Sequence, residues 1–175
     1  GEGAGAMICE TLEHAQTRGA PSLGEIVGYG SSAVGPPHET FLQSAVANAL
    51  RAALGSEDPQ AIGHIHAHGL GTVECDAQES AAIQSVFGPP DRQPPITTAK
   101  GSLGNLGAGG GMVESIASMK ALNGSLFPIL NCDAPADDCP INACVDDATP
   151  AGSQFINVNV TPQGQASAIR IRVFE

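Results

Sequence analysis

The stretch that decides the fold is His64-Ile65-His66-Ala67-His68-Gly69-Leu70-Gly71-Thr72. A second stretch of the same kind begins some thirty residues later and reads Ile96-Thr97-Thr98-Ala99-Lys100-Gly101-Ser102-Leu103-Gly104-Asn105-Leu106-Gly107-Ala108-Gly109. Each stretch runs from a short apolar-flanked segment, which we expect to be a strand, through glycines into an amphipathic helix. In an alternating strand-helix protein, sites form at the carboxyl ends of neighbouring strands. The two turns are therefore expected to bring an imidazole and an ammonium or amide group to one pocket.

Length and composition limit the possible classes of protein. The 175 residues are enough for one domain with a real core. Because aromatic residues make up only 3% and Trp is absent, that core must rely on small aliphatic side chains and close backbone approach. The formal net charge of -11 makes nucleic acid and anionic membrane surfaces poor partners. Five cysteines without paired spacing favour a reducing, cytoplasmic location over a disulfide framework. The chain starts at Gly1 rather than Met, so we expect it to be a segment of a longer protein.

Periodicity predicts an α/β arrangement. Apolar spacing indicates helices over residues 12–18, 40–54, 77–87 and 106–123. Strands are expected over residues 6–10, 25–30, 62–68, 96–98, 155–160 and 168–174, with a loop over residues 31–38. The last two strands are separated by Gln163-Gly164-Gln165, which predicts a closing antiparallel pair. Strand-helix alternation that ends in such a pair is typical of a mixed sheet flanked by helices.

Two of the predicted helices carry more specific expectations. The helix over 40–54 has an apolar stripe formed by Leu42, Val46, Ala49, Leu50 and Ala53. In the helix over 106–123 apolar residues spread round most of the cylinder, with two charged residues among them, so we expect it to be buried on all sides in a complete protein. The apolar residues are Met112, Val113, Ile116, Ala117 and Met119, and the charged ones are Glu114 and Lys120.

The three histidines of the first stretch raise the possibility of a metal site. Residues i, i+2 and i+4 of a strand share one face, so His64, His66 and His68 could line up and bind Zn²⁺, with residues 74–76 nearby. A single strand rarely presents three ligands at tetrahedral angles to one ion, however. We therefore expect no metal, and we interpret His64 and His66 as partly buried histidines with a hydrogen bond each. A metal-binding, hydrolase-like domain is kept as an alternative.

The order of the motifs resembles the β-ketoacyl synthases, the condensing enzymes of the thiolase-like fold. His68-Gly69-Leu70-Gly71-Thr72 resembles their His-Gly-Thr-x-Thr turn, and Thr98-Ala99-Lys100 resembles their Thr-Lys turn with Ala99 inserted. Asn105 stands where that family has Gly-His. The resemblance implies one half-repeat of the thiolase-like fold. Residues 1–22 would then end the amino-terminal half of the parent protein, and residues 23–175 would form its C-terminal domain.

The resemblance also implies roles for individual residues. His68 would hydrogen-bond the thioester carbonyl of a malonyl unit while carbon dioxide leaves. Lys100 would organise the site electrostatically together with a glutamate, and Glu79 occupies the matching place eleven residues beyond His68. Glu79 is equally well interpreted as a capping-box carboxylate with Asp76 as the N-cap. Asn105 fits the Cys-His-Asn sites of initiating synthases and chalcone synthases, where the amide is the second donor to the carbonyl. No cofactor is implied.

Two departures from the family pattern limit what this chain can do. The family's nucleophilic cysteine lies in the amino-terminal half, before residue 1, and we expect none of the five cysteines here to be catalytic. Residues 161–165 replace the family's Phe-Gly-Phe-Gly-Gly gating loop and keep only its glycine at 164. The implied parent activity is decarboxylative condensation of acyl and malonyl thioesters, carried by acyl-carrier protein or coenzyme A, in fatty acid or polyketide synthesis. The chain alone should be inactive. It would pair with the missing amino-terminal half in a homo-oligomer. A non-catalytic chain-length-factor-like subunit is the alternative.

Overall fold

The computed structural model describes residues 1–35 and 39–174. Its α-helices are α1 (Leu12–Thr17), α2 (Phe41–Leu54), α3 (Val73–Phe87), α4 (Lys100–Leu103) and α5 (Gly110–Ala121). Its strands are β1 (Glu25–Ala33), β2 (His64–His66), β3 (Ile96–Thr97), β4 (Gln154–Val160) and β5 (Gln165–Arg172). Single 3₁₀ turns are formed by η1 (Pro59–Ala61), η2 (Pro90–Arg92) and η3 (Gly107–Gly109). No helix in the described part of the chain is long and apolar enough to cross a bilayer.

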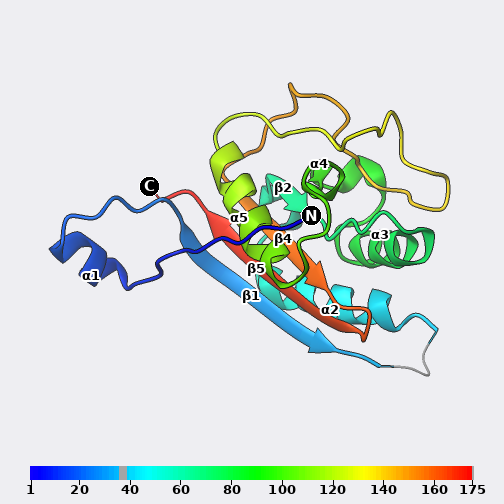
Figure 1. The fold of residues 1–175 in the computed structure, drawn as a ribbon, viewed down its shortest axis with the longest axis horizontal. Helices are drawn as coiled ribbons and strands as arrows, with labels where there is room; N and C mark the ends of the chain where they lie inside the picture. The colour runs from blue at the N-terminus through cyan, green and yellow to red at the C-terminus, as the bar shows by residue number, and fades with distance from the viewer. Residues whose placement is uncertain (36–38, 175) are drawn as a thin grey trace.

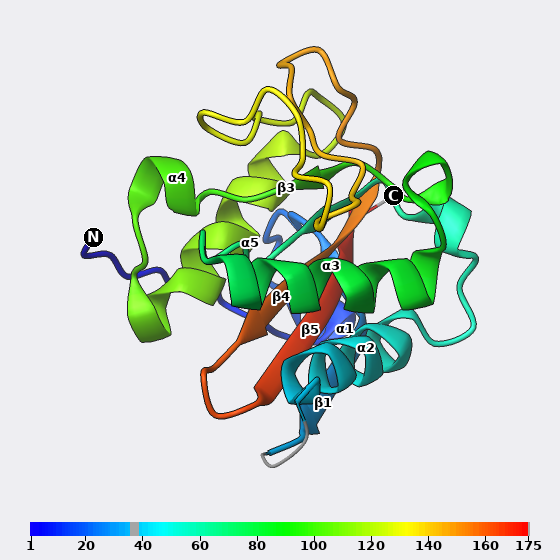
Figure 2. The ribbon, with the colours of Figure 1, turned by 90° about the vertical axis from the view of Figure 1, so that its right-hand side faces the viewer.

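The strands form one mixed sheet in the order β1-β5-β4-β2-β3. The pairs β1–β5 and β5–β4 are antiparallel, whereas β4–β2 and β2–β3 are parallel. Helices α2 and α3 cover one face of this sheet and α5 covers the other, as Figures 1 and 2 show together. The mixed α/β class and the closing antiparallel pair predicted from the sequence are thus confirmed. Because β2 and β3 are parallel neighbours, the turns that follow them leave the sheet at the same edge.

Helix α2 lies unusually close to the sheet. The residues of its predicted stripe are all buried, and they form one apolar core with Ile65, Ile156 and Val158 of the sheet. A Cβ atom on Gly28 or Gly30 of β1 would overlap the carbonyl oxygens of Ala53 and Ala49 in α2. The absence of side chains at these two positions lets the helix backbone pack directly on the strand. This close approach is how a chain with few aromatic residues builds a dense core.

Several predicted element boundaries need correction. Residues 6–10 form no strand: they lead from the segment beside α5 toward α1, and Ile8 is 87% exposed. A strand needs a hydrogen-bonded neighbour, and the described part of the chain offers none at this place. Strand β1 continues to Ala33, into the predicted loop over residues 31–38, of which residues 36–38 lie outside the described part. Strands β2 and β3 are shorter than predicted.

Helix α5 presents small and polar side chains, not its large apolar ones, to the sheet. The predicted helix over 106–123 begins at Gly110 and ends at Ala121, after the 3₁₀ turn η3. The residues that face the sheet are small or polar, and Glu114, Ser115 and Ser118 are at most 3% exposed. The apolar residues on the opposite side, Met112, Val113, Ile116 and Met119, are only half-buried. A Cβ atom on Gly5 would lie 3.0 Å from Cγ of Met112 and from Cδ1 of Ile116, so the chain at Gly5 runs close to this side of α5. Helix α5 therefore contributes polar side chains to the interior at the sheet edge where β2 and β3 end.

Candidate active site

The turn after β2 is built around a buried carboxylate. The backbone N–H of His68 donates to Oε1 of Glu79 (2.7 Å), and that of Gly69 donates to Oε2 (2.8 Å). Gly69 and Gly71 both adopt positive φ, 50° and 82°, which lets the chain turn sharply at the strand end. Burial raises the pKa of Glu79 to about 7, although the N–H groups of Gly69 and His68 act in the opposite direction. Glu79 thus holds the His68 turn in place.

This contact revises two expectations for Glu79. The carboxylate that meets Lys100 is not Glu79, and the capping-box prediction is wrong. Helix α3 starts at Val73 with Thr72 as its N-cap, so Asp76 lies within the first turn. The Asp76 carboxylate instead accepts a hydrogen bond from the N–H of Gly71 (3.1 Å). Both acidic residues therefore bind the glycine turn, because the helix begins four residues earlier than the apolar pattern indicated.

The His68 imidazole is largely buried and neutral at pH 7. Burial lowers the pKa of its ring to about 4, the charge of Lys100 lowers it further, and the side chain of Asn159 acts in the opposite direction. Its Nδ1 is buried and has no hydrogen-bond partner among the described residues. Such orphaned atoms are rare in folded proteins. A neutral imidazole can donate an N–H without carrying a charge, as oxyanion stabilisation requires.

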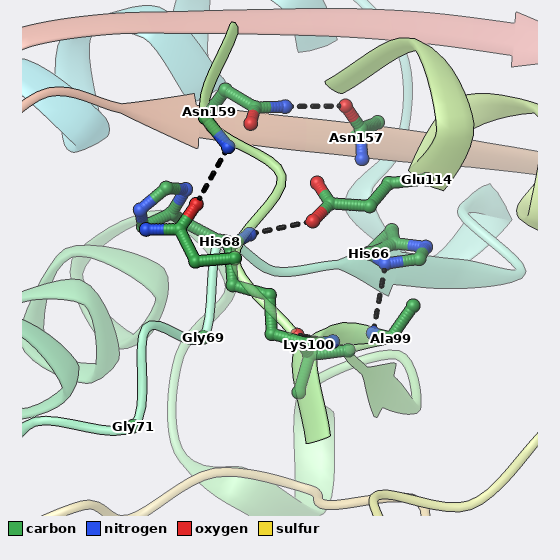
Figure 3. Close-up of polar contacts among 12 residues, drawn as sticks. His66, His68, Gly69, Gly71, Ala99, Lys100, Glu114, Asn157 and Asn159 are labelled. Atoms are coloured by element: carbon green, nitrogen blue, oxygen red, sulfur yellow. Dashed lines mark hydrogen bonds and ion pairs between the residues drawn. The ribbon is translucent and has the colours of Figure 1, made fainter. Parts of the chain in front are cut away.

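Lys100 forms a buried ion pair with Glu114. Its Nζ lies 2.6 Å from Oε1 of Glu114, and the two side chains are only 6% and 3% exposed. Lys100 is the first residue of α4, directly after β3, and Glu114 projects from the sheet-facing side of α5. Figure 3 shows the pair beside His68 and in front of β4. The second carboxylate oxygen, Oε2, is buried without a hydrogen-bond partner among the described residues. The site therefore holds a buried ammonium paired with a carboxylate from α5, and one oxygen of that carboxylate is left without a partner among the described residues.

Two asparagines of β4 belong to this cluster, although the sequence analysis missed them. The Nδ2 of Asn159 donates to Oδ1 of Asn157 (2.8 Å), and both side chains point toward the space occupied by His68, Glu114 and His66 (Figure 3). Asn157 is 3% exposed, and its Nδ2 lacks a hydrogen-bond partner within the described residues. Asn at alternate positions of an otherwise apolar strand, Phe155 to Val160, is the signal that could have revealed them.

Asn105 is exposed, whereas the other three predicted site residues, His68, Glu79 and Lys100, are buried. Its Oδ1 accepts a hydrogen bond from the backbone N–H of Gly107 (3.0 Å), so the side chain closes the turn that precedes α5. A cavity of about 230 Å³ lies next to His68, and its walls include Thr72, Cys75 and Thr161. A larger cavity of about 410 Å³ lies on the other side of the turn, between α3 and residues 129–141, and His68 does not line it. Of these two cavities, the smaller one is lined by His68, whereas Lys100 and Glu114 line neither.

The cysteines provide no activated thiol at this cavity. Cys75 lies in the first turn of α3 and is buried. Burial raises the pKa of its thiol to about 11, and the carboxylates of Glu79, Asp76 and Glu74 add to that effect. A thiol with so high a pKa carries almost no thiolate at neutral pH.

His64 and His66 are buried and engaged in hydrogen bonds within the protein. Both ring nitrogens of His64 have partners, Ala151 O and Ser118 Oγ, and so do both ring nitrogens of His66. Burial lowers the pKa of His64 to about 4 and that of His66 to about 3. No group of three His, Cys, Asp or Glu side chains in the described ranges is arranged to hold a metal ion. The geometry thus favours hydrogen-bonded histidines over a three-histidine ligand set.

The chain is similar to known proteins over most of its length. The family model described as "Beta-ketoacyl synthase, C-terminal domain" matches residues 23–133, which include both glycine-rich turns and the Lys100–Glu114 pair. The chain belongs to this family. The chain is 30% identical over 154 residues to 3-oxoacyl-[acyl-carrier-protein] synthase 2 of Staphylococcus aureus, covering 85% of this chain and 38% of the relative. It is 33% identical over 147 residues to nodulation protein E of Rhizobium leguminosarum bv. trifolii, covering 81% of this chain and 36% of that protein.

Solved structures show the same architecture over nearly the whole chain. A β-ketoacyl synthase from Burkholderia phymatum STM815 superimposes with a TM-score of 0.86 at 28% identity, covering 95% of this chain and 41% of that one. The ishigamide ketosynthase/chain length factor gives a TM-score of 0.84 at 27% identity, covering 95% and 42%. The thiolase-like fold expected from the motifs is therefore confirmed. The chain spans less than half the length of these relatives.

Proposed function

We propose that this chain is the carboxyl-terminal part of a decarboxylating condensing protein that acts on malonyl and acyl thioesters. The observation that carries the proposal is the neutral, buried His68, which lines a cavity and lies near the Lys100–Glu114 ion pair. Glu79 holds the backbone of His68 in place. A neutral N–H donor and a nearby ammonium suit the negative charge that develops on a thioester oxygen. The share of the relatives that the chain covers supports a role as part of a larger protein.

In the proposed reaction the carbon–carbon bond to the malonyl carboxylate breaks, and its electron pair becomes an enolate as carbon dioxide leaves. His68 donates a hydrogen bond to the enolate oxygen, Asn105 is the second donor, and Lys100 stabilises the negative charge at longer range. The enolate carbon then attacks the carbonyl carbon of an acyl group held as a thioester on a cysteine of the amino-terminal half. The new carbon–carbon bond forms as the cysteine leaves as a thiolate. The thioesters are carried by acyl-carrier protein or coenzyme A.

The 175-residue chain alone should not catalyse this reaction, because it lacks the nucleophile. In the complete protein, release of carbon dioxide from malonyl thioester should fall about 100-fold or more in His68→Ala, the usual loss when an oxyanion donor is removed. The exposed His14 of α1 provides the matched control, and His14→Ala should leave the rate unchanged. Equal rates for His68→Ala and the wild type, or turnover by the isolated chain that depends on His68, would refute the proposal.

A non-catalytic partner subunit similar to a chain length factor is the second candidate. The exposed Asn105, whose side chain is used to close its own turn, favours this reading, as does the similarity to a ketosynthase/chain length factor structure. A ketosynthase in complex with its chain length factor is also among the structural neighbours, although at 20% identity it supports the fold alone. The two candidates are separated by the residue at the nucleophile position: a complete protein with Cys there condenses an acyl thioester with malonyl thioester, and one without it does not.

The missing amino-terminal half is the partner proposed for α5. The outward face of α5 is apolar and only partly covered by residues 1–11, while its inward face is polar, the reverse of a surface helix. Residues 1–22 precede the family match and extend away from the sheet with α1, which fits the proposal that they close the amino-terminal half. We expect the isolated chain to self-associate through this face. A clean monomer in sedimentation at tens of micromolar, without hydrophobic dye binding, would contradict this assignment.

A further inference from the structure

A continuous chain of hydrogen bonds runs from the Ala99–Lys100 turn through the interior to the far end of the sheet. The N–H of Ala99 donates to Nε2 of His66 (3.2 Å, Figure 3), and Nδ1 of His66 lies 2.8 Å from Oγ of Ser118. The same hydroxyl lies 3.0 Å from Nε2 of His64, whose Nδ1 lies 2.7 Å from the carbonyl oxygen of Ala151. Both imidazoles and Ser118 are 0% exposed.

The direction of every bond in this chain is determined by its two ends. A backbone N–H can only donate, so Nε2 of His66 must be the unprotonated nitrogen, and the neutral ring then carries its proton on Nδ1. That Nδ1–H donates a hydrogen bond to Oγ of Ser118. The Ser118 hydroxyl in turn donates its single O–H to Nε2 of His64. His64 in turn carries its proton on Nδ1 and donates to Ala151 O, which can only accept. Burial disfavours the charged form of both rings, which is consistent with this arrangement.

Aromatic contacts fix the planes of the two rings. His64 stacks on Phe155 of β4, with ring centroids 5.1 Å apart and 13° between the planes. His66 lies 5.6 Å from Phe127 at an angle of 59°. Neither ring can rotate freely in such an environment, because rotation would separate it from its hydrogen-bond partners and from the packed aromatic ring. The chain of hydrogen bonds is therefore rigid as well as directional.

Helix α5 contacts the Ala99–Lys100 turn at two successive points. Glu114 and Ser118 are four residues apart and lie on the same face of α5. Glu114 binds Nζ of Lys100, and Ser118 holds the N–H of Ala99 through His66. The first contact orients the end of the lysine side chain, and the second fixes the N-cap residue of α4, from which that side chain starts.

We propose that His66 is a positioning residue, supported by Ser118 and His64, and that it fixes the backbone of the Ala99–Lys100 turn so that Lys100 is presented to the site. The assignment of Lys100 to catalysis rests on the function proposed above, whereas the positioning of the turn does not.

The experiment measures tautomers and amide exchange by NMR in the 175-residue chain. Both His64 and His66 should show the Nδ1–H tautomer at neutral pH, a readout that needs no variant. Ser118→Ala should speed exchange of the Ala99 amide by about fivefold or more, the loss expected for one buried hydrogen bond. Ser115→Ala, at an equally buried position on the same helix, is the control and should leave Ala99 unchanged. His66→Gln keeps one acceptor and one donor and should retain protection that His66→Leu loses.

Each outcome bears on one part of the proposal. An Nε2–H tautomer of His66, or Ala99 exchange that is the same in Ser118→Ala as in Ser115→Ala, would overturn it. In the complete protein, Ser118→Ala should lower kcat for malonyl decarboxylation and leave KM unchanged, since the turn and not the substrate contact is altered. If the tautomers and the Ala99 protection are as stated but the wild-type protein does not decarboxylate, the proposed function fails and the positioning role stands.

Discussion

The buried ion pair between Lys100 and Glu114 makes the sharpest stability prediction. In Glu114→Gln the side chain keeps its shape, but the ammonium of Lys100, at 6% exposure, loses its counter-charge. Breaking a buried pair by removing one partner typically costs 3–5 kcal/mol, and we expect about 3 kcal/mol here because the amide oxygen can still accept a hydrogen bond. That is a large fraction of the free energy of unfolding of an ordinary domain.

A surface pair in the same chain provides the matched control. Glu25 and Arg172 lie 2.9 Å apart, but their side chains are 46% and 53% exposed. Glu25→Gln should therefore cost between 0 and about 1 kcal/mol, because solvent screens an exposed pair. The measurement is urea unfolding of each variant at neutral pH, followed by circular dichroism, at low and at high salt. Salt should reduce the effect of Glu25→Gln and leave that of Glu114→Gln almost unchanged.

The double variant Lys100→Met/Glu114→Leu distinguishes the cost of an uncompensated charge from the cost of altered packing. Replacing both charges by apolar side chains of similar size removes the desolvation cost together with the attraction, so most of the lost stability should return. The reasoning would be refuted if Glu114→Gln costs no more than Glu25→Gln. It would also be refuted if the double variant is as unstable as the single one, since the cost would then come from packing rather than from an uncompensated charge.

Three further predictions concern pH, packing and thiol reactivity. Burial lowers the folded pKa of the three histidines of the first stretch from 6.5 to about 3 or 4, so their contribution to stability is complete above pH 6.5 and is lost on acidification. Glu79, with its pKa raised from 4.5 to about 7, contributes in the opposite sense, and Glu79→Gln should steepen the loss of stability measured by urea unfolding from pH 6.5 down to 4.5. Gly30→Ala should cost about 1–3 kcal/mol in the same assay, because its Cβ meets the α2 backbone, whereas Gly35→Ala, in open space, should change little. Alkylation followed by mass spectrometry should modify the exposed Cys9 well before Cys75, whose pKa is about 11, and the reverse order would show that the thiol is accessible and ionised.

Local patterns were enough to predict most of the fold. The apolar stripe of α2 runs at helical spacing and ends at Gly55, so its 14 residues were predicted almost to the boundary. The two glycine-rich turns after β2 and β3 could be located because positive φ and sharp reversals leave a direct trace in the sequence. His68 and Lys100 could be named for the same reason, since each stands next to such a turn. The roles assigned to them remain proposals.

The tertiary structure alone decided which side chains meet. The sequence pointed to Glu79 as the glutamate that accompanies Lys100, and only the packing of α5 against β4 and β2 brings Glu114 to the lysine instead. The same packing turns the polar side of α5 inward. Hydrophobic periodicity locates this helix but does not say which of its sides faces the sheet, because its apolar residues spread round most of the cylinder. The polar groups of α5 can face the sheet because partners from distant strands satisfy them there, as His64 and His66 satisfy Ser118.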